Sequence, residues 1–81
     1  MNCTIKLSCY AQGRNNSAYI LKLIENLSQR ENLSLEFNDL STKIHGNYFE
    51  IMNTLAEELF ILHNTLQINQ FAIKTEIQFE N

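Results

Sequence analysis

The feature that most constrains this chain is a change of hydrophobic period in its middle. Over residues 33–45 apolar side chains alternate with polar ones, which is typical of strands with one buried face. Over residues 48–66 they recur at helical spacing, which predicts a helix from Tyr48 to Leu66. Asn47 followed three residues later by Glu50 has the spacing of a capping box. We therefore expect the strand to break at Gly46 and the helix to follow.

The strand-like half also contains a change of parity. Its apolar positions are odd before residue 38 and even after it: Leu33, Leu35 and Phe37, then Leu40 and Ile44. A two-residue hairpin turn at Asn38-Asp39 accounts for this, because Asn and Asp tolerate the positive φ of such turns. The resulting pairs are Phe37 with Leu40, Leu35 with Thr42, and Leu33 with Ile44. A longer, bulged turn is the alternative.

The flanking segments supply the remaining elements. Alternating patterns predict strands over residues 3–10 and 71–79, and an apolar stripe from Ile20 to Leu27 predicts a helix capped by Ser17. The order is then βαββαβ. One-faced strands and two amphipathic helices imply a ferredoxin-like α+β fold. We expect a four-stranded antiparallel sheet, in the spatial order fourth, first, third and second strand, with both helices on one face.

Length and charge narrow the classes of function. Eighty-one residues predict a single domain over 1–81, and a net charge of −3 without a basic run disfavours nucleic-acid binding. The longest apolar run, residues 59–62, is too short to span a membrane. The start of the chain has no signal-peptide pattern, so we expect a cytoplasmic protein.

No catalytic motif stands in the sequence, and we expect no enzyme activity, no cofactor and no metal. Cys3 and Cys9 lie six residues apart in one predicted strand, roughly 20 Å along it, which excludes a disulfide between them. Both share the apolar parity of that strand, so they are expected to be small buried thiols. His45 and His63 add no metal-ligand spacing.

The predicted topology places the end of the first strand beside the beginning of the third. Polar side chains gather there, and we take them as candidate ligand-binding residues: Ser8, Tyr10, Asn38, Asp39, Ser41 and Thr42. Thr42 points inward by parity, as does Thr75 in the last strand. A buried hydroxyl needs a partner, and that partner is either nearby backbone or a small polar ligand.

Two segments resemble the YkoF-like family of thiamine- and hydroxymethylpyrimidine-binding proteins. They are Ser8-Cys9-Tyr10 and Leu40-Ser41-Thr42-Lys43-Ile44-His45-Gly46, the latter followed by an amphipathic helix. Ala11 stands where the family has proline, and His45 where it has arginine. The resemblance implies reversible binding of a thiamine-like ligand in uptake or salvage. It also implies self-association into a dimer or tetramer, since these proteins carry two such domains in tandem.

Three other classes share this topology. An acylphosphatase would use Arg14 after the first strand, but Asn15-Asn16-Ser17 departs from that enzyme's motif. An RNA recognition motif would need Tyr48 and Phe49 on the sheet rather than on the predicted helix. A regulatory or structural dimer would pair through the open sheet face. That face is expected to carry Lys6, Ser8, Tyr10, Glu36, Lys43, His45, Lys74 and Glu76.

Overall fold

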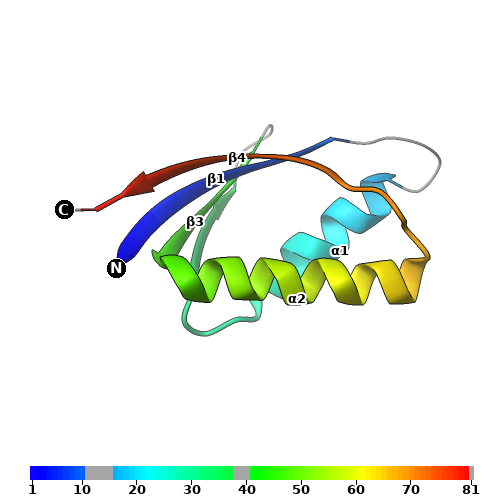
Figure 1. Cartoon of the computed structure of the whole chain (residues 1–81), viewed down its shortest axis with the longest axis horizontal. Coiled ribbons are helices and arrows are strands. Elements are labelled where there is room, and N and C mark those ends of the chain that lie inside the picture. Colours follow the sequence, from blue (N-terminus) through cyan, green and yellow to red (C-terminus); the bar gives the residue numbers. More distant parts are fainter. Residues whose placement is uncertain (11–15, 38–40, 81) are drawn as a thin grey trace.

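The computed structural model describes residues 1–10, 16–37 and 41–80, without the side chains of Tyr10 and residues 16–19 (Figure 1). Its elements follow the predicted βαββαβ order. They are β1 (Asn2–Tyr10), α1 (Asn16–Ser28), β2 (Ser34–Phe37), β3 (Thr42–Asn47), α2 (Tyr48–Leu66) and β4 (Ala72–Phe79). The helix predicted over 48–66 is therefore confirmed at both ends. Over the described residues, neither helix has the length and apolar character needed to cross a bilayer.

The four strands form one antiparallel sheet in the order β2-β3-β1-β4, which confirms the ferredoxin-like α+β topology. Figure 1 shows both helices on the same side of this sheet, with α2 running beneath β1 and β4. Alternate residues of β1 face the helices: Cys3, Ile5 and Leu7 are at most 2% exposed. These side chains meet apolar residues from α1, α2 and β3, namely Leu23, Leu27, Ile44, Ile51 and Leu62.

The β2–β3 hairpin departs from the predicted register by two residues. Phe37 pairs with Thr42 and Leu35 with Ile44, so residues 38–41 separate the last pair. The two-residue turn was therefore wrong, and the longer connection is the correct alternative. A shift of two residues leaves every side chain on its predicted face, because the side-chain period of a strand is two. Phe37 nevertheless stays 56% exposed at the end of this short edge strand.

The sequence suggested that Gly46 breaks the strand, and this expectation is wrong. The glycine lies inside β3, opposite Cys3. A Cβ atom at this position would lie 3.1 Å from Leu33 Cδ2 and 3.3 Å from the carbonyl oxygen of Asn32. A larger residue would therefore crowd the chain that enters β2, which passes close to the β3 backbone at this point.

The ends of the helices also differ in detail from prediction. Asn47 caps α2 as expected, since its Oδ1 accepts from the backbone N–H groups of Phe49 (3.0 Å) and Glu50 (3.2 Å). The Glu50 carboxylate, however, accepts from Asn32 Nδ2 at 2.9 Å, which ties the helix start to the segment before β2. Helix α1 begins at Asn16, so Ser17 lies inside it and is not its cap.

A buried carboxylate holds the two helices together. Glu58 of α2 is 5% exposed and accepts from Arg30 Nη2 and from Asn26 Nδ2, both at 2.9 Å. The same guanidinium reaches Glu57 Oε2 at 3.2 Å, but the Glu57 side chain is 62% exposed. Two adjacent carboxylates thus contact one arginine, one inside the protein and one in solvent.

We expect Glu58→Ala to lower the free energy of unfolding by about 2–3 kcal/mol, because it leaves the Asn26 and Arg30 donors without their buried acceptor. Glu57→Ala is the matched control and should change stability by no more than about 0.5 kcal/mol, because exposed ion pairs contribute little. Urea unfolding followed by circular dichroism measures both. Equal effects of the two substitutions would contradict this account.

Candidate ligand-binding site

The end of β1 meets the beginning of β3, as the candidate site requires. Leu7 pairs with Thr42, so Ser8 and Ser41 are the next residues beyond that pair. Asn38 and Asp39 lie outside the described residues. The side chain of Tyr10 does too, although its backbone pairs with Ala72 of β4. Three of the six candidate positions, Ser8, Ser41 and Thr42, are therefore neighbours at one end of the sheet.

These candidates do not share a face of the sheet. Thr42 is 5% exposed and lies opposite the buried Leu7, so its hydroxyl is on the helix side. Ser8 follows Leu7, pairs with Lys74 and belongs to the opposite face. Ser41 is buried, at 8% exposure. A small ligand on one side of the sheet can thus reach Thr42 or Ser8, but not both.

A row of three residues crosses the helix side of the sheet at this end. Leu7 pairs with Thr42 of β3 on one side and with Thr75 of β4 on the other. Because neighbouring strands lie roughly 4.8 Å apart, the two threonines are roughly 10 Å apart and flank one apolar side chain. Thr75 was expected to be buried, yet the structure leaves it exposed.

Thr75 is exposed because it opens into a groove between β4 and α2. The groove encloses about 360 Å³ and is lined by Leu7, Met52, Leu55, Ala56, Leu59, Ile73 and Thr75. Its walls are almost wholly apolar, and the Thr75 hydroxyl is the polar side-chain group among them. An apolar hollow of this size with few polar groups is the usual form of a small-molecule site.

Sequence reasoning identified Thr75 by parity but missed the α2 wall of this groove. Met52 and Leu59 looked like ordinary core positions of an amphipathic helix. Ala56 was the available signal, because a small residue on the apolar stripe, facing a strand with an inward threonine, leaves space that larger side chains would fill.

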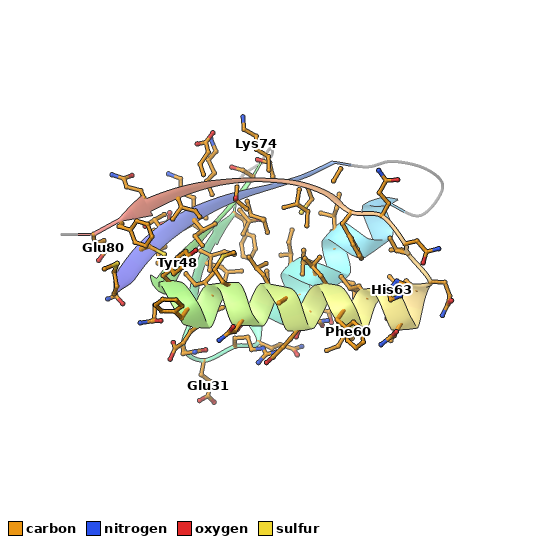
Figure 2. All side chains as sticks on the ribbon, viewed as in Figure 1. Glu31, Tyr48, Phe60, His63, Lys74 and Glu80 are labelled. Carbon is orange, nitrogen blue, oxygen red and sulfur yellow. The ribbon has the colours of Figure 1, made fainter. Side chains whose placement is uncertain are left out.

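The opposite face of the sheet carries polar and charged side chains, as predicted. Figure 2 shows Lys74 pointing away from the helices on this face. Glu36, Lys43, Lys6 and Glu76 occupy one row across the four strands, with acids at both ends and lysines in the middle. A shallow depression of about 440 Å³ lies over Lys6 and Lys43. The balanced charges of this row are typical of a solvated face.

A chain of polar contacts lies beside that row. The Thr4 hydroxyl is 2.8 Å from His45 Nδ1, and His45 Nε2 is 3.5 Å from a Glu36 carboxylate oxygen. When Nε2 carries the ring proton toward Glu36, Nδ1 accepts from the threonine. Such a chain orients the imidazole on the open face. Among the described residues, no group of three or more His, Cys, Asp or Glu side chains is arranged to hold a metal ion.

Both cysteines carry free thiols, and they differ in exposure. Cys3 is fully buried, whereas Cys9 is half-buried and pairs with Ile73, a residue of the groove. Burial raises the pKa of the Cys3 thiol above its ordinary value of 9.0, and the nearby Glu80 carboxylate raises it further. Burial alone raises the pKa of Cys9. Cys9 is thus the more accessible reporter of this part of the fold.

Neither a family sequence model nor a curated protein sequence matches the chain. Solved structures match its fold. SP2199 of Streptococcus pneumoniae aligns with a TM-score of 0.80 at 22% identity, over 100% of this chain and 89% of its own. TM0486 of Thermotoga maritima, named as a candidate thiamine biosynthesis/salvage protein, gives 0.79 at 18% identity, over 99% and 85%. A Bacillus cereus domain of unknown function, DUF77, gives 0.64 at 14% identity, over 98% and 76%. At these identities the likeness establishes the fold alone.

We expect a small thiol reagent to label Cys9 before Cys3, with both rates still rising above pH 9, because the thiolate is the reactive form and both pKa values are raised. The unfolded chain also loses thiol protons at a lower pH than the folded one. Stability should therefore be unaffected by the thiols below pH 9 and fall above it. Mass spectrometry after timed labelling gives the order in which the two thiols react. The Cys9→Ser variant leaves Cys3 alone, so that its slower labelling can be followed by itself. Prior labelling of Cys3 would contradict the burial described.

Proposed function

We propose that this protein binds, without converting it, a small molecule with an aminopyrimidine ring, of the thiamine or hydroxymethylpyrimidine kind. It would serve uptake or salvage of that compound in the cytoplasm and act as a self-associated assembly. The observation that carries the proposal is the apolar groove between β4 and α2, with the Thr75 hydroxyl as the polar side-chain group in its lining. A hydroxyl group beside apolar walls suits a flat ring with a hydrogen-bonding edge.

The walls of the groove support a ring rather than a charged or extended ligand. Leu59 and Ile73 give apolar surface on the helix and strand sides, and Met52 adds a thioether beside them. Thioether–aromatic contacts contribute about 0.3–1.5 kcal/mol each. The Thr75 hydroxyl both donates and accepts, so it can serve either the ring nitrogen or the exocyclic amine of an aminopyrimidine.

The pyrimidine end of the ligand is better supported than a thiazolium end. A thiazolium cation would favour a nearby carboxylate or aromatic face. Glu76, one acidic candidate, pairs with Lys6 on the open face and not in the groove. The other, Asp39, lies outside the described residues. Hydroxymethylpyrimidine, which lacks the cation, is the simpler fit to the described walls.

Two kinds of likeness point to thiamine chemistry. The Leu40–Gly46 and Ser8–Tyr10 segments resemble the YkoF-like family, and TM0486, which shares this fold, is named for thiamine biosynthesis or salvage. The rival functions have weaker support. Tyr48 and Phe49 open α2 rather than lie on a strand, so they offer no RNA-stacking platform on the sheet. The acylphosphatase candidate Arg14 lies outside the described residues.

Calorimetric titration with thiamine and with hydroxymethylpyrimidine tests the proposal. We expect both to release or absorb heat on binding, with hydroxymethylpyrimidine retaining most of the affinity. Ala56→Leu should abolish binding, because the larger side chain fills the groove, whereas Asn64→Leu places the same leucine side chain on α2 outside the groove and should leave binding unchanged.

A weaker, graded effect is expected at the threonine that lines the groove. Thr75→Val preserves shape and removes the hydroxyl that lines the groove, which should weaken binding about two- to tenfold. Absence of heat and of any thermal shift at millimolar ligand would rule out the thiamine-like ligand. Binding unaffected by Ala56→Leu would show that the ligand occupies another place.

A further inference from the structure

Strand β4 is a long, regular edge strand. It occupies one end of the sheet order, and its eight residues pair with β1 in one continuous register from Ala72 to Phe79. An edge strand of this kind presents unpaired backbone groups that can add another strand, and proteins usually shorten, bulge or kink such edges. The other edge, β2, has four residues. Residues 72–79 contain no proline.

The hydrogen-bond pattern shows which backbone groups of β4 point outward. Glu80 N–H donates to the Asn2 carbonyl at 3.0 Å, which marks this pair as a hydrogen-bonded one. Hydrogen-bonded and non-hydrogen-bonded pairs alternate along an antiparallel ladder. Even-numbered β4 residues therefore bond to β1. The backbone groups of Ile73, Thr75 and Ile77 face away from it, along the open edge.

We propose that a second copy of this chain adds its β4 antiparallel to this edge, with the two Thr75 residues opposite each other. The inference rests on the self-association in the proposed function and names its surface. Thr75 and the partner's Thr75 form a hydrogen-bonded pair on the axis. Ile73 with the partner's Ile77, and Ile77 with the partner's Ile73, form the next two such pairs. All outward backbone groups of the strand centre then find partners.

Charge selects this register. Lys74 lies opposite the partner's Glu76, and Glu76 opposite the partner's Lys74, at non-hydrogen-bonded positions where facing side chains are closest. Sliding one strand by two residues opposes Glu76 to the partner's Glu76, or Lys74 to the partner's Lys74. Sliding by one residue turns the apolar side chains to the wrong face. Lys74 and Glu76 already lie 3.8 Å apart within the chain and are both well exposed.

Apolar side chains along this edge are exposed to solvent. Ile77 is 39% exposed and Phe79 46%, although both lie on the face toward the helices. Phe79 also contacts Tyr48, whose ring touches the 68% exposed Phe49, so the apolar surface continues onto α2. Figure 2 places Tyr48 at the α2 end that approaches β4. Pairing of the strands extends the sheet and buries the isoleucines of both copies.

Pairing also completes the groove. Ile73 and Thr75 line its β4 side, and in the proposed register they face the partner's Ile77 and Thr75. The groove that is open in one copy thus gains a wall from the other. A ligand held there would contact both chains.

Sedimentation velocity over a concentration series tests the interface on the full chain. We expect the wild type at twice the 9.5 kDa chain mass. Lys74→Glu and Glu76→Lys, each alone, oppose like charges at two symmetric places and should weaken the dimer by about tenfold or more. The double variant K74E/E76K should dimerise again. Lys22→Glu makes the same change of charge at an exposed position of α1 and, as the matched control, should leave the dimer intact.

Mixing gives the sharpest readout. An equimolar mixture of Lys74→Glu and Glu76→Lys chains should form a mixed dimer, because every opposed pair then joins an acid to a base. Recovery on mixing also shows that each variant is folded. A wild type that stays at 9.5 kDa at several hundred micromolar overturns self-association and this interface together. A wild-type dimer indifferent to both substitutions overturns the interface but leaves self-association standing. Calorimetric titration tests the groove separately, because one chain alone lines it.

Discussion

The structure depends on the pairing of β1 with a strand on each of its sides. The backbone groups of the odd-numbered β1 residues form hydrogen bonds with β3, and those of the even-numbered residues with β4. The Tyr48–Met1 and Glu80–Asn2 backbone hydrogen bonds show this alternation. This double pairing places Cys3, Ile5 and Leu7 at the centre of the core, at most 2% exposed. It also puts Leu7 between two threonines and leaves β4 as the edge. The candidate groove and the candidate interface both follow from that one strand.

The two helices cover the sheet unevenly. Inward residues of β1 are buried, whereas inward residues of β4 remain 39–46% exposed at Ile77 and Phe79. Helix α2 presents the small Ala56 to the groove beside Ile73 and Thr75, whereas its larger side chains Ile51 and Leu62 pack into the core. A surface of this kind is stabilised when something apolar covers it. The proposed ring ligand and the proposed second copy of β4 would cover it at adjacent places.

Local patterns predicted most of the fold, and their failures have physical causes. The α2 boundaries agree because Asn47 caps the helix through its own neighbours. The hairpin register was wrong by two residues because such a shift keeps Leu35 and Phe37 on the same face, so hydrophobic parity cannot detect it. Thr75 was placed on the correct face, but its exposure depends on how α2 packs. The candidate residues Ser8 and Thr42 were placed at the correct end of the sheet, on opposite faces.

The sequence by itself determined the elements, their order and the face of each side chain, because periods of two and 3.6 residues follow from local backbone geometry. The tertiary structure alone decided the hairpin register, the groove between β4 and α2, and the row that joins Thr42 to Thr75. These depend on how segments far apart in the chain dock. Their packing depends on the room that small residues such as Gly46 and Ala56 leave for residues distant in the sequence. No local pattern records this.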